Sequence, residues 1–279
     1  MSSGRDSSSH YPAQIVDIDD PDDPRLAPYR SIRERDLVGR DGRFVAEGKV
    51  VLGMLLRSAR FSAESVLVLR SKLPGLAETL APVSASTPIY VVGNDVMDAV
   101  AGFHLHRGVL AIGTKPRPTG IRALLAACPD DALVVAAVGI ANHDNVGAIF
   151  RNAAAFGASA VMLDETSCDP LYRKSIRVSV GSVLTLPYAR EGSGTRMIDA
   201  LQAEAFSVIA LSPRGTIDLW DLPRAGRVAL LLGTEGEGLP ETLLSRLKTA
   251  RIPMQTGLDS LNVATTAAVA LYELTRGRR

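Results

Sequence analysis

Short, almost uninterrupted apolar runs alternate with helix-like segments through the second half of the chain. Such runs are typical of strands buried on both faces, as in a parallel sheet with helices on both sides. The pattern therefore predicts an α/β fold with a parallel sheet. The expected strands are 133–139, 160–163, 183–186, 207–211, 228–232 and 250–253.

A smaller α/β pattern precedes this region. Apolar runs at 65–69, 89–92 and 108–113 predict short strands, and a helix is expected around Val50, Met54 and Arg57. Pro and Gly in "TKPRPTG" indicate a linker. The tail before the small domain is poor in apolar residues and ends in "DIDDPDDP", which predicts disorder. The expected division is a disordered tail 1–24, a small domain with an N-terminal arm 25–113, a linker 114–120 and a main domain 121–279.

Composition narrows the class of protein. The 279 residues are 46% hydrophobic with a formal net charge of +1, so overall charge does not indicate a nucleic-acid partner. Cys128 and Cys168 are far apart, which disfavours a disulfide framework, and the four histidines lack zinc-site spacing. No apolar run approaches the ~20 residues that span a bilayer. We expect a cytoplasmic protein with no metal and no membrane contact.

The first candidate motif is "NHDNVGAIFRNAAAFGAS", residues 142–159. Asn142 or Asp144 can cap a helix that Gly157 ends. Ile149, Ala153 and Phe156 share the face expected to meet the core, whereas Arg151 does not. The neighbours of Arg151 at helical spacing are small, which leaves room for a ligand or another chain. A solvated surface arginine is the alternative.

The second motif is "LGTEGEGLP", a glycine-rich turn directly after a predicted strand. Such turns often hold phosphates through backbone N–H groups. This one carries Glu235 and Glu237 and no Lys or Arg, and its carboxylates would repel a phosphate. Gly233, Gly236 and Gly238 permit close approach to a ligand of another kind. An ordinary turn into a helix is the alternative.

The third motif is "RIPMQTGLDSLNVATTAAVALYEL", residues 251–274. Val263, Ala267, Ala270 and Leu274 mark the buried stripe of a final helix. Ser260 and Asn262 lie where helix-capping residues are expected. Capping explains either of them, but one cap would suffice, so the second polar residue indicates a further role.

In this order and spacing, the three motifs of residues 121–279 resemble those of the SpoU (TrmH) family of SPOUT RNA 2′-O-ribose methyltransferases. The intervening "DPLYRKSIRVSVGS" looks like the family's segment between motifs one and two. Residues 41–113, with "FVAEGKVV" and "HRGVLAI", are similar to the small L30e-like substrate-binding domain of many members. The resemblance implies a SPOUT-type parallel sheet flanked by helices, with a C-terminal trefoil knot.

The resemblance also implies a reaction, in-line methyl transfer from S-adenosylmethionine (AdoMet) to a ribose 2′-OH, by a homodimer without a metal. The positively charged sulfonium tolerates the carboxylates of motif two. Arg151 would act as base or, since guanidinium is always protonated, as stabiliser of the developing alkoxide. One departure is Ala264, where the family has a serine that Thr265 or Thr266 could replace. The matching catalytic residues are Arg151, Asn145, Glu235, Ser260 and Asn262, and the cofactor-binding residues are Gly233, Ile252 and Leu261, with Leu211 and Gly236 beside them.

A basic cluster is the candidate for RNA contact, and it consists of Arg173, Lys174 and Arg177. Phosphate contact and a solvated face are both open interpretations. The likeness to the L30e-like domain favours ribosomal RNA as the substrate, with transfer RNA second.

Two other functions are alternatives to this hypothesis. A nucleotide-binding oxidoreductase needs GxGxxG after its first strand, but "GIANHDNVG" does not fit. A non-catalytic RNA-binding protein that keeps the fold is the alternative, and the retained polar residues of the three motifs speak against it.

Overall fold

The computed structural model describes residues 13–30, 38, 42–101, 107–222, 226–255, 257 and 260–276. The chain separates into two compact units. One contains Met1–Pro116 and Leu171–Thr185, and the other contains Arg117–Pro170 and Leu186–Arg279. No described helix has the length and apolar character needed to cross a membrane.

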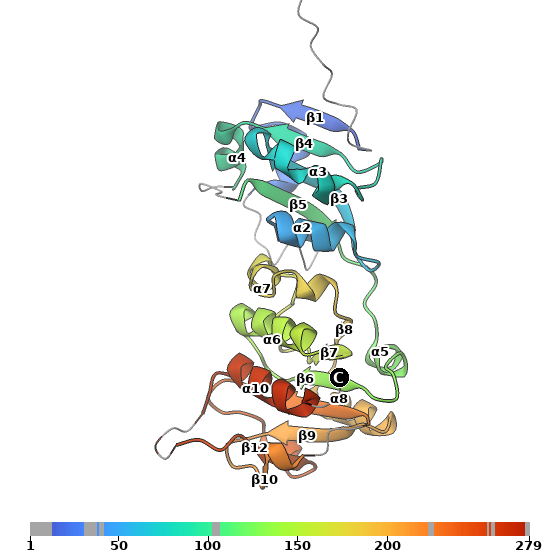
Figure 1. Ribbon diagram of the computed structural model, residues 1–279, viewed down its shortest axis with the longest axis vertical. Coiled ribbons are helices and arrows are strands. Elements are labelled where there is room, and N and C mark those ends of the chain that lie inside the picture. Colours follow the sequence, from blue (N-terminus) through green and yellow to red (C-terminus); the bar gives the residue numbers. More distant parts are fainter. Residues whose placement is uncertain are drawn as a thin grey trace, which may run out of the picture. The chain divides into compact units, whose positions relative to one another are not determined.

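The first unit is built on a five-stranded mixed sheet with the strand order β1-β4-β3-β5-β2 (Figure 1). β2 and β3 pair with β5 in antiparallel fashion, whereas β4 pairs with β3 and β1 in parallel. The expected strand 89–92 is confirmed without change. The strands are β1 (Ile15–Ile18), β2 (Arg43–Glu47), β3 (Ser62–Leu69), β4 (Ile89–Val92) and β5 (Val109–Thr114).

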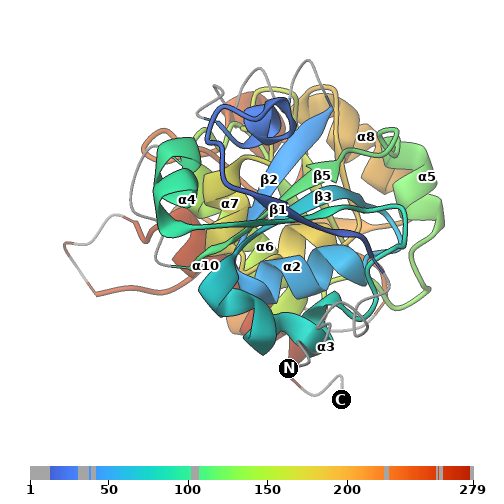
Figure 2. The same cartoon turned by 90° about the horizontal axis from the view of Figure 1, so that it is seen from above.

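Helices cover both faces of this sheet (Figure 2). On one face, η2 (Pro24–Tyr29) and α4 (Asn94–Ala101) pack over the side chains of β3 and β5. On the other lie α2 (Lys49–Leu56), as the sequence predicted, and α3 (Ala77–Leu80). A short turn, η3 (Arg70–Leu76), connects β3 to α3.

The prediction of a disordered tail over 1–24 is wrong from Ile15 onward. Ile15–Ile18 forms β1 and pairs with β4, because its apolar residues join the sheet despite the polar average around them. The acidic run that begins within β1 forms ion pairs, including those of Arg70 with Asp17 and Asp19. Hydrogen bonds from the Arg25 side chain and backbone lower the pKa of Asp23 to about 2. Residues 1–12 lie outside the described part of the chain.

The second unit contains a seven-stranded sheet, and every pairing in it is parallel. The sequence predicted the strands 160–163, 207–211 and 228–232 without error. The order is β10-β12-β9-β11-β6-β7-β8, with β11 and β6 near the centre. The strands are β6 (Leu133–Ala137), β7 (Ala160–Leu163), β8 (Tyr188–Arg190), β9 (Ser207–Leu211), β10 (Ile217–Asp218), β11 (Val228–Leu232) and β12 (Lys248–Arg251).

Two helix layers enclose this sheet (Figure 1). α5 (Ile121–Ala126) and α8 (Gly194–Ala203) build a core with one face. α6 (His143–Ala155) and α10 (Val263–Thr275) pack against each other on the opposite side. The remaining short elements are η5 (Leu219–Asp221) and α9 (Glu241–Leu244). This is the parallel sheet between helices that the apolar runs predicted. The trefoil knot and the L30e-like character of the first unit stay predictions.

Two differences concern the segment after β7. The expected strand 183–186 is instead the 3₁₀ turn η4 (Ser182–Leu184), because successive turn hydrogen bonds, such as Thr185 N–H to Ser182 C=O, close the chain locally. Residues 171–185 were expected in the main domain but group with the first unit. There α7 (Arg173–Val178) packs on β2, and Arg173 Nε donates to the buried carboxylate of Glu47 at 3.0 Å.

Candidate functional site

Motifs one and two meet because the strands before them, β6 and β11, end level with each other and with the neighbouring strand β7. Ala137 at the end of β6 is in register with Leu232 of β11 and with Leu163 of β7. The chain therefore leaves all three strands at the same edge of the sheet, where parallel α/β folds bind ligands. Motif one follows β6, motif two follows β11, and a segment that begins with Asp164 follows β7.

Motif one forms α6 as predicted, with Asn142 rather than Asp144 as its N-cap residue. The Asn142 side chain accepts from Asp144 N–H at 2.8 Å. Asn145 lies in the first turn and is only 5% exposed. Arg151 is exposed on the same helix. Arg151 lies six positions after Asn145. In an α-helix this spacing places the two residues about 9 Å apart along the axis and on different faces.

Asn262 joins the three motifs and fixes the orientation of two amide groups. Its Oδ1 caps α10 by accepting from the N–H groups of Ala264 and Thr265. Its Nδ2 is therefore the group that faces the other motifs, donating to Asn145 Oδ1 at 3.0 Å and to Glu235 Oε1 at 3.4 Å. Because that atom of Asn145 accepts, the other end of its amide is a donor. This buried Nδ2 has no hydrogen-bond partner among the described residues.

Motif two is a glycine-rich loop that folds back on itself. Thr234 forms a β-bridge with Gly238, and its hydroxyl donates to the Gly238 carbonyl at 3.0 Å. A Cβ on Gly233 would lie 2.4 Å from Leu239 N, so only glycine fits there without a backbone shift. Gly236 has φ +90°, a conformation that favours glycine. The sequence indicated that glycine is needed at Gly233 and Gly236, but not the close contact or the backbone angle that requires it.

A cavity of about 460 Å³ opens between motifs one and two. Its walls are the turn from β6 into α6 and the start of the motif-two loop. The lining residues are Gly139, Ile140, Ala141, Asn142, Thr234 and Glu235. This hollow lies at the strand ends where the chain's candidate catalytic residues gather.

A buried carboxylate beneath this cavity escaped the sequence analysis. Asp164 is 3% exposed, and it accepts hydrogen bonds from Gly139 N–H, Ser167 N–H, the Ser167 hydroxyl and the Thr166 hydroxyl. Burial raises the pKa of Asp164, but these hydrogen bonds outweigh it and lower the pKa below its ordinary value. The available signal was an Asp directly after a strand and before Thr and Ser, a pattern typical of side-chain-bonded turns.

The other candidate residues lie near the same sheet edge but are not hydrogen-bonded into the cluster. Ser260 and Leu261 are exposed just before α10, Leu211 ends β9, and Ile252 follows β12 half-buried. The predicted stripe of α10 is confirmed, since Val263, Ala267, Ala270 and Leu274 are all buried.

The departure at Ala264 leaves the backbone of that residue hydrogen-bonded at both its N–H and its carbonyl. The Ala264 carbonyl accepts from Asn152 Nδ2 at 2.8 Å, a contact between α10 and α6 that the sequence did not reveal. Of the two threonines that follow, Thr266 places its hydroxyl 3.5 Å from the Leu261 carbonyl. Thr266 therefore places a hydroxyl next to the segment that leads into α10.

Comparison with known proteins agrees with this arrangement. The SpoU rRNA Methylase family matches residues 132–272, which include motifs one and two and all but the last two residues of motif three. An uncharacterized tRNA/rRNA methyltransferase of Mycobacterium tuberculosis is 39% identical over 99% of this chain and 97% of its own length. The similarity thus extends through both units.

Solved structures are similar over almost the whole chain. An AdoMet-bound rRNA methyltransferase from Sinorhizobium meliloti superposes with a TM-score of 0.78 at 25% identity, covering 95% of this chain and 98% of that one. An RNA 2′-O ribose methyltransferase superposes with a TM-score of 0.76 at 28% identity, covering 94% and 99%. With its three motifs assembled at one sheet edge, the chain belongs to the SpoU family of tRNA/rRNA methyltransferases.

Proposed function

We propose that this protein transfers the methyl group of AdoMet to a ribose 2′-OH of RNA, with ribosomal RNA as the first candidate and transfer RNA as the second. The observation that carries the proposal is the hydrogen-bonded cluster of Asn145, Glu235 and Asn262, one residue from each motif. The names of similar proteins support it, since one is a 2′-O ribose methyltransferase and another an AdoMet-bound rRNA methyltransferase.

The motif-two loop suits a cofactor that carries a positive charge. Glu235 and Glu237 are exposed on it, and the loop contains no Lys or Arg. The backbone packs so tightly at Gly233 that no side chain fits there, since a Cβ would lie 2.4 Å from Leu239 N. We assign AdoMet to Gly233, Gly236, Ile252, Leu261 and Leu211. When bound, AdoMet supplies the electrophilic methyl group on its sulfonium.

The chain's own residues then orient and stabilise the RNA hydroxyl. A ribose hydroxyl is a poor nucleophile at neutral pH and needs charge stabilisation as its proton leaves. The exposed guanidinium of Arg151 stabilises the developing alkoxide. A substrate oxygen that reaches the cluster would satisfy the amide donor of Asn145, which is costly to leave buried without an acceptor. Asn262 holds that amide and also bonds to Glu235, and Ser260 completes the set.

Gly233→Ala is expected to weaken AdoMet binding at least about tenfold, because the added Cβ would lie 2.4 Å from Leu239 N and force the loop open. Isothermal titration calorimetry measures the Kd. Gly75→Ala is the matched control, since a Cβ there meets nothing within 4 Å. Equal affinities for the two variants would contradict the assigned cofactor site.

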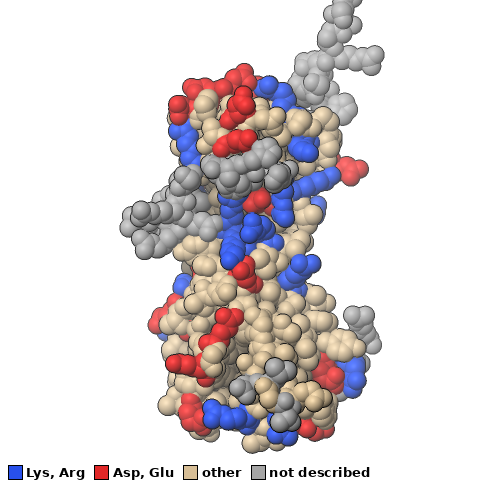
Figure 3. Space-filling model, turned by 90° about the vertical axis from the view of Figure 1, so that its left-hand side faces the viewer, with Lys and Arg blue, Asp and Glu red and all other residues tan. Residues whose placement is uncertain are grey.

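The proposed RNA-contacting residues on α7 differ in their exposure and in their contacts within the protein. Lys174 and Arg177 are exposed, whereas the Arg173 guanidinium is bonded to Glu47, so we expect the smallest contribution from Arg173. Lys and Arg side chains gather on one face of the molecule (Figure 3). Phosphate contacts of this kind make binding salt-dependent.

Combining Lys174→Glu with Arg177→Glu is expected to weaken RNA binding about tenfold or more and to flatten its salt dependence. Filter binding over a range of salt concentrations measures both effects. Lys248→Glu with Arg122→Glu reverses two exposed charges in the other unit as a control. The same loss in both double variants would point to a general charge effect rather than to contact through α7.

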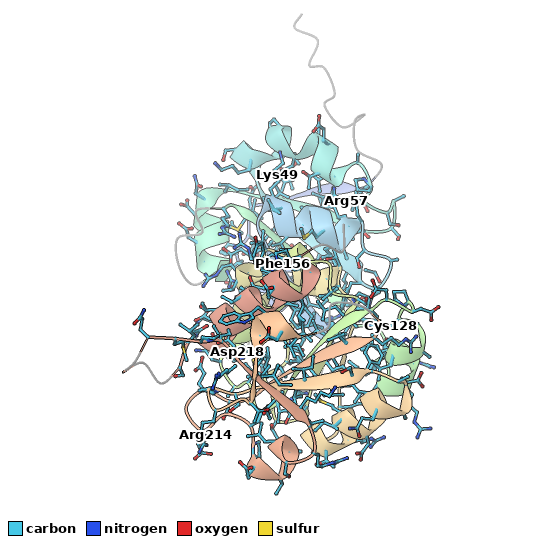
Figure 4. The ribbon with its side chains drawn as sticks, turned by 60° about the horizontal axis from the view of Figure 1, so that its bottom comes forward. Lys49, Arg57, Cys128, Phe156, Arg214 and Asp218 are labelled. Atoms are coloured by element: carbon cyan, nitrogen blue, oxygen red, sulfur yellow. The ribbon has the colours of Figure 1, made fainter. Side chains whose placement is uncertain are left out.

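We also propose that the active form is a homodimer. Large apolar side chains are exposed on α10 and on η5, which contacts it: Val269 at 39%, Tyr272 at 58% and Trp220 at 53%. Phe156, which directly follows α6 (Figure 4), packs edge-on against Tyr272, with ring centroids 6.1 Å apart. Exposed apolar surface of this kind is typical of a protein–protein interface.

Val269→Glu is expected to shift the protein from dimer to monomer, because it places a charge in the proposed interface. Sedimentation equilibrium measures the change. Val50→Glu is the control, since Val50 is 57% exposed in the other unit. A wild-type protein that is monomeric at micromolar concentration would contradict the proposal.

The function itself is tested by transfer of labelled methyl from AdoMet to ribosomal subunits, total RNA and undermodified tRNA. Alkaline hydrolysis follows, because a 2′-O-methyl group leaves a dinucleotide uncleaved. Label in resistant dinucleotides supports the proposal and identifies the RNA class. Label in mononucleotides would indicate base methylation. RNA binding without any label would favour the non-catalytic RNA-binding alternative.

A further inference from the structure

A buried pair of side chains, Asp164 and Ser167, connects the end of β7 with the turn that leads from β6 into α6. Asp164 Oδ1 accepts from Gly139 N–H at 2.9 Å and from the Ser167 hydroxyl at 2.6 Å. The same Ser167 oxygen accepts from Ile140 N–H at 3.0 Å. Cys168 N–H donates to the Ile140 carbonyl at 2.9 Å. Three of these bonds join the segment after β7 to two consecutive residues of the turn, and the fourth links Asp164 to Ser167.

The turn depends on these bonds because Ile140 is buried and Gly139 is half-buried. Ile140 is 2% exposed and Ser167 is 0% exposed. Backbone N–H groups in such surroundings need a protein partner, and losing that partner is costly. The N–H groups of Gly139 and Ile140 thus bond to the chain's own side chains. They are not available to bind a phosphate, although the turn precedes a helix.

The turn forms part of the proposed methyl-transfer site. Gly139 and Ile140 line its cavity, and α6 begins three residues after Ile140. Gly139 also lies against motif two, since a Cβ there would be 2.5 Å from Thr234 Cγ2. Asp164 and Ser167 therefore set the position of the motif-one turn, and of Asn145 beyond it, relative to the loop that carries Glu235.

We propose that Asp164 and Ser167 are positioning residues for methyl transfer. They act by holding the backbone of Gly139 and Ile140 so that Asn145 meets Asn262 and Glu235. This inference rests on the proposed function. Displacement of catalytic groups by about 1 Å can lower a rate about 10²-fold. Loss of the hydrogen bonds from Asp164 and Ser167 to the turn should therefore lower kcat.

Neighbouring hydroxyls provide a matched pair of variants. Ser167→Ala removes both the bond to Asp164 and the acceptor of Ile140 N–H. Thr166→Val also removes a hydroxyl bonded to Asp164, but that hydroxyl binds the other carboxylate oxygen and does not touch the turn. Asp164→Asn is the conservative variant, because its remaining oxygen can still accept from Gly139 and Ser167. Asp164→Ala removes all of these bonds.

Two measurements test the proposal. The first is amide hydrogen exchange of the full-length protein, without cofactor. We expect exchange at Ile140 to be about tenfold faster in Ser167→Ala than in Thr166→Val. The second is kcat per AdoMet-binding site under conditions where every variant is folded. We expect a loss of about 10- to 100-fold in Ser167→Ala and Asp164→Ala, little change in Thr166→Val, and partial recovery in Asp164→Asn. The Kd for AdoMet should change less than threefold.

A purely structural role predicts a different result. In that case Ser167→Ala melts at a lower temperature, yet its kcat per binding site equals that of Thr166→Val, and the proposal is overturned. Unchanged exchange at Ile140 overturns it as well. If Ser167→Ala does not fold, the comparison of Asp164→Asn with Thr166→Val decides. A wild-type protein that methylates no RNA contradicts the proposed function, and exchange at Ile140 then decides alone whether the pair holds the turn.

Discussion

Arg151→Ala is expected to lower kcat for methyl transfer by about 10²- to 10³-fold, the usual loss when one group that stabilises developing charge is removed. The fold should be unaffected. Arg151 is exposed on α6, no hydrogen bond of its side chain is present in the described structure, and alanine is a strong helix former. The rate is measured in single turnovers at saturating AdoMet, which separates the chemical step from product release.

The control for this variant is Arg122→Ala, which removes an exposed arginine from α5 of the same unit. It should keep the wild-type rate and melting temperature. Equal rates for the two variants would remove Arg151 from the mechanism and leave the remaining cluster to be tested. A loss of rate together with a lower melting temperature in Arg151→Ala would instead indicate a structural role.

Arg151→Lys distinguishes the two roles considered for this residue. A stabiliser needs only positive charge near the alkoxide, so lysine should recover part of the rate and leave its pH dependence unchanged. A base must lose a proton, and the ordinary pKa of lysine lies about two units or more below that of arginine. If Arg151 is the base, the lysine variant should therefore shift the alkaline limb of the pH–rate profile to lower pH. The exposure of Arg151 favours the stabiliser, since a guanidinium in water stays protonated.

The elements that the sequence predicted best are those whose burial is uniform. β7, β9 and β11 were predicted to the residue because each is an apolar run buried on both faces. β1 was missed, because its pairing with β4 depends on residues over 70 positions away that no local average contains. The segment 183–186 has the apolar character of a strand but closes into a turn. Short apolar runs do not distinguish these states.

The candidate site shows a similar division. Sequence motifs identified Asn145, Glu235 and Asn262, and the structure connects them by hydrogen bonds. The puzzle of two polar residues where one cap suffices is settled for Asn262, which caps α10 with one atom and reaches the other motifs with the other. Asp164 escaped notice because its role depends on strand register. Only the alignment of β7 with β6 places it under Gly139.

Asn262→Asp is expected to lower kcat by about 10²-fold while leaving stability almost unchanged, because it separates the two roles of this side chain. One carboxylate oxygen still caps α10, and Asp is as good an N-cap residue as Asn. The other oxygen takes the place of Nδ2, where it faces Asn145 Oδ1 and the Glu235 carboxylate. It can no longer donate, so Asn145 must turn its amide around. The donor that Asn145 keeps for a ligand then becomes an acceptor.

Asn262→Ala provides the opposite comparison, since it removes the cap together with the contacts. It should lose about 1 kcal/mol of unfolding free energy in addition to activity. Asn262→Ser restores a cap without an amide and should recover stability but not rate. Denaturant unfolding and single-turnover methyl transfer measure the two properties on the same preparations. If Asn262→Asp kept the wild-type rate, the amide orientation set by the α10 cap would have no part in the reaction, and capping would fully account for Asn262.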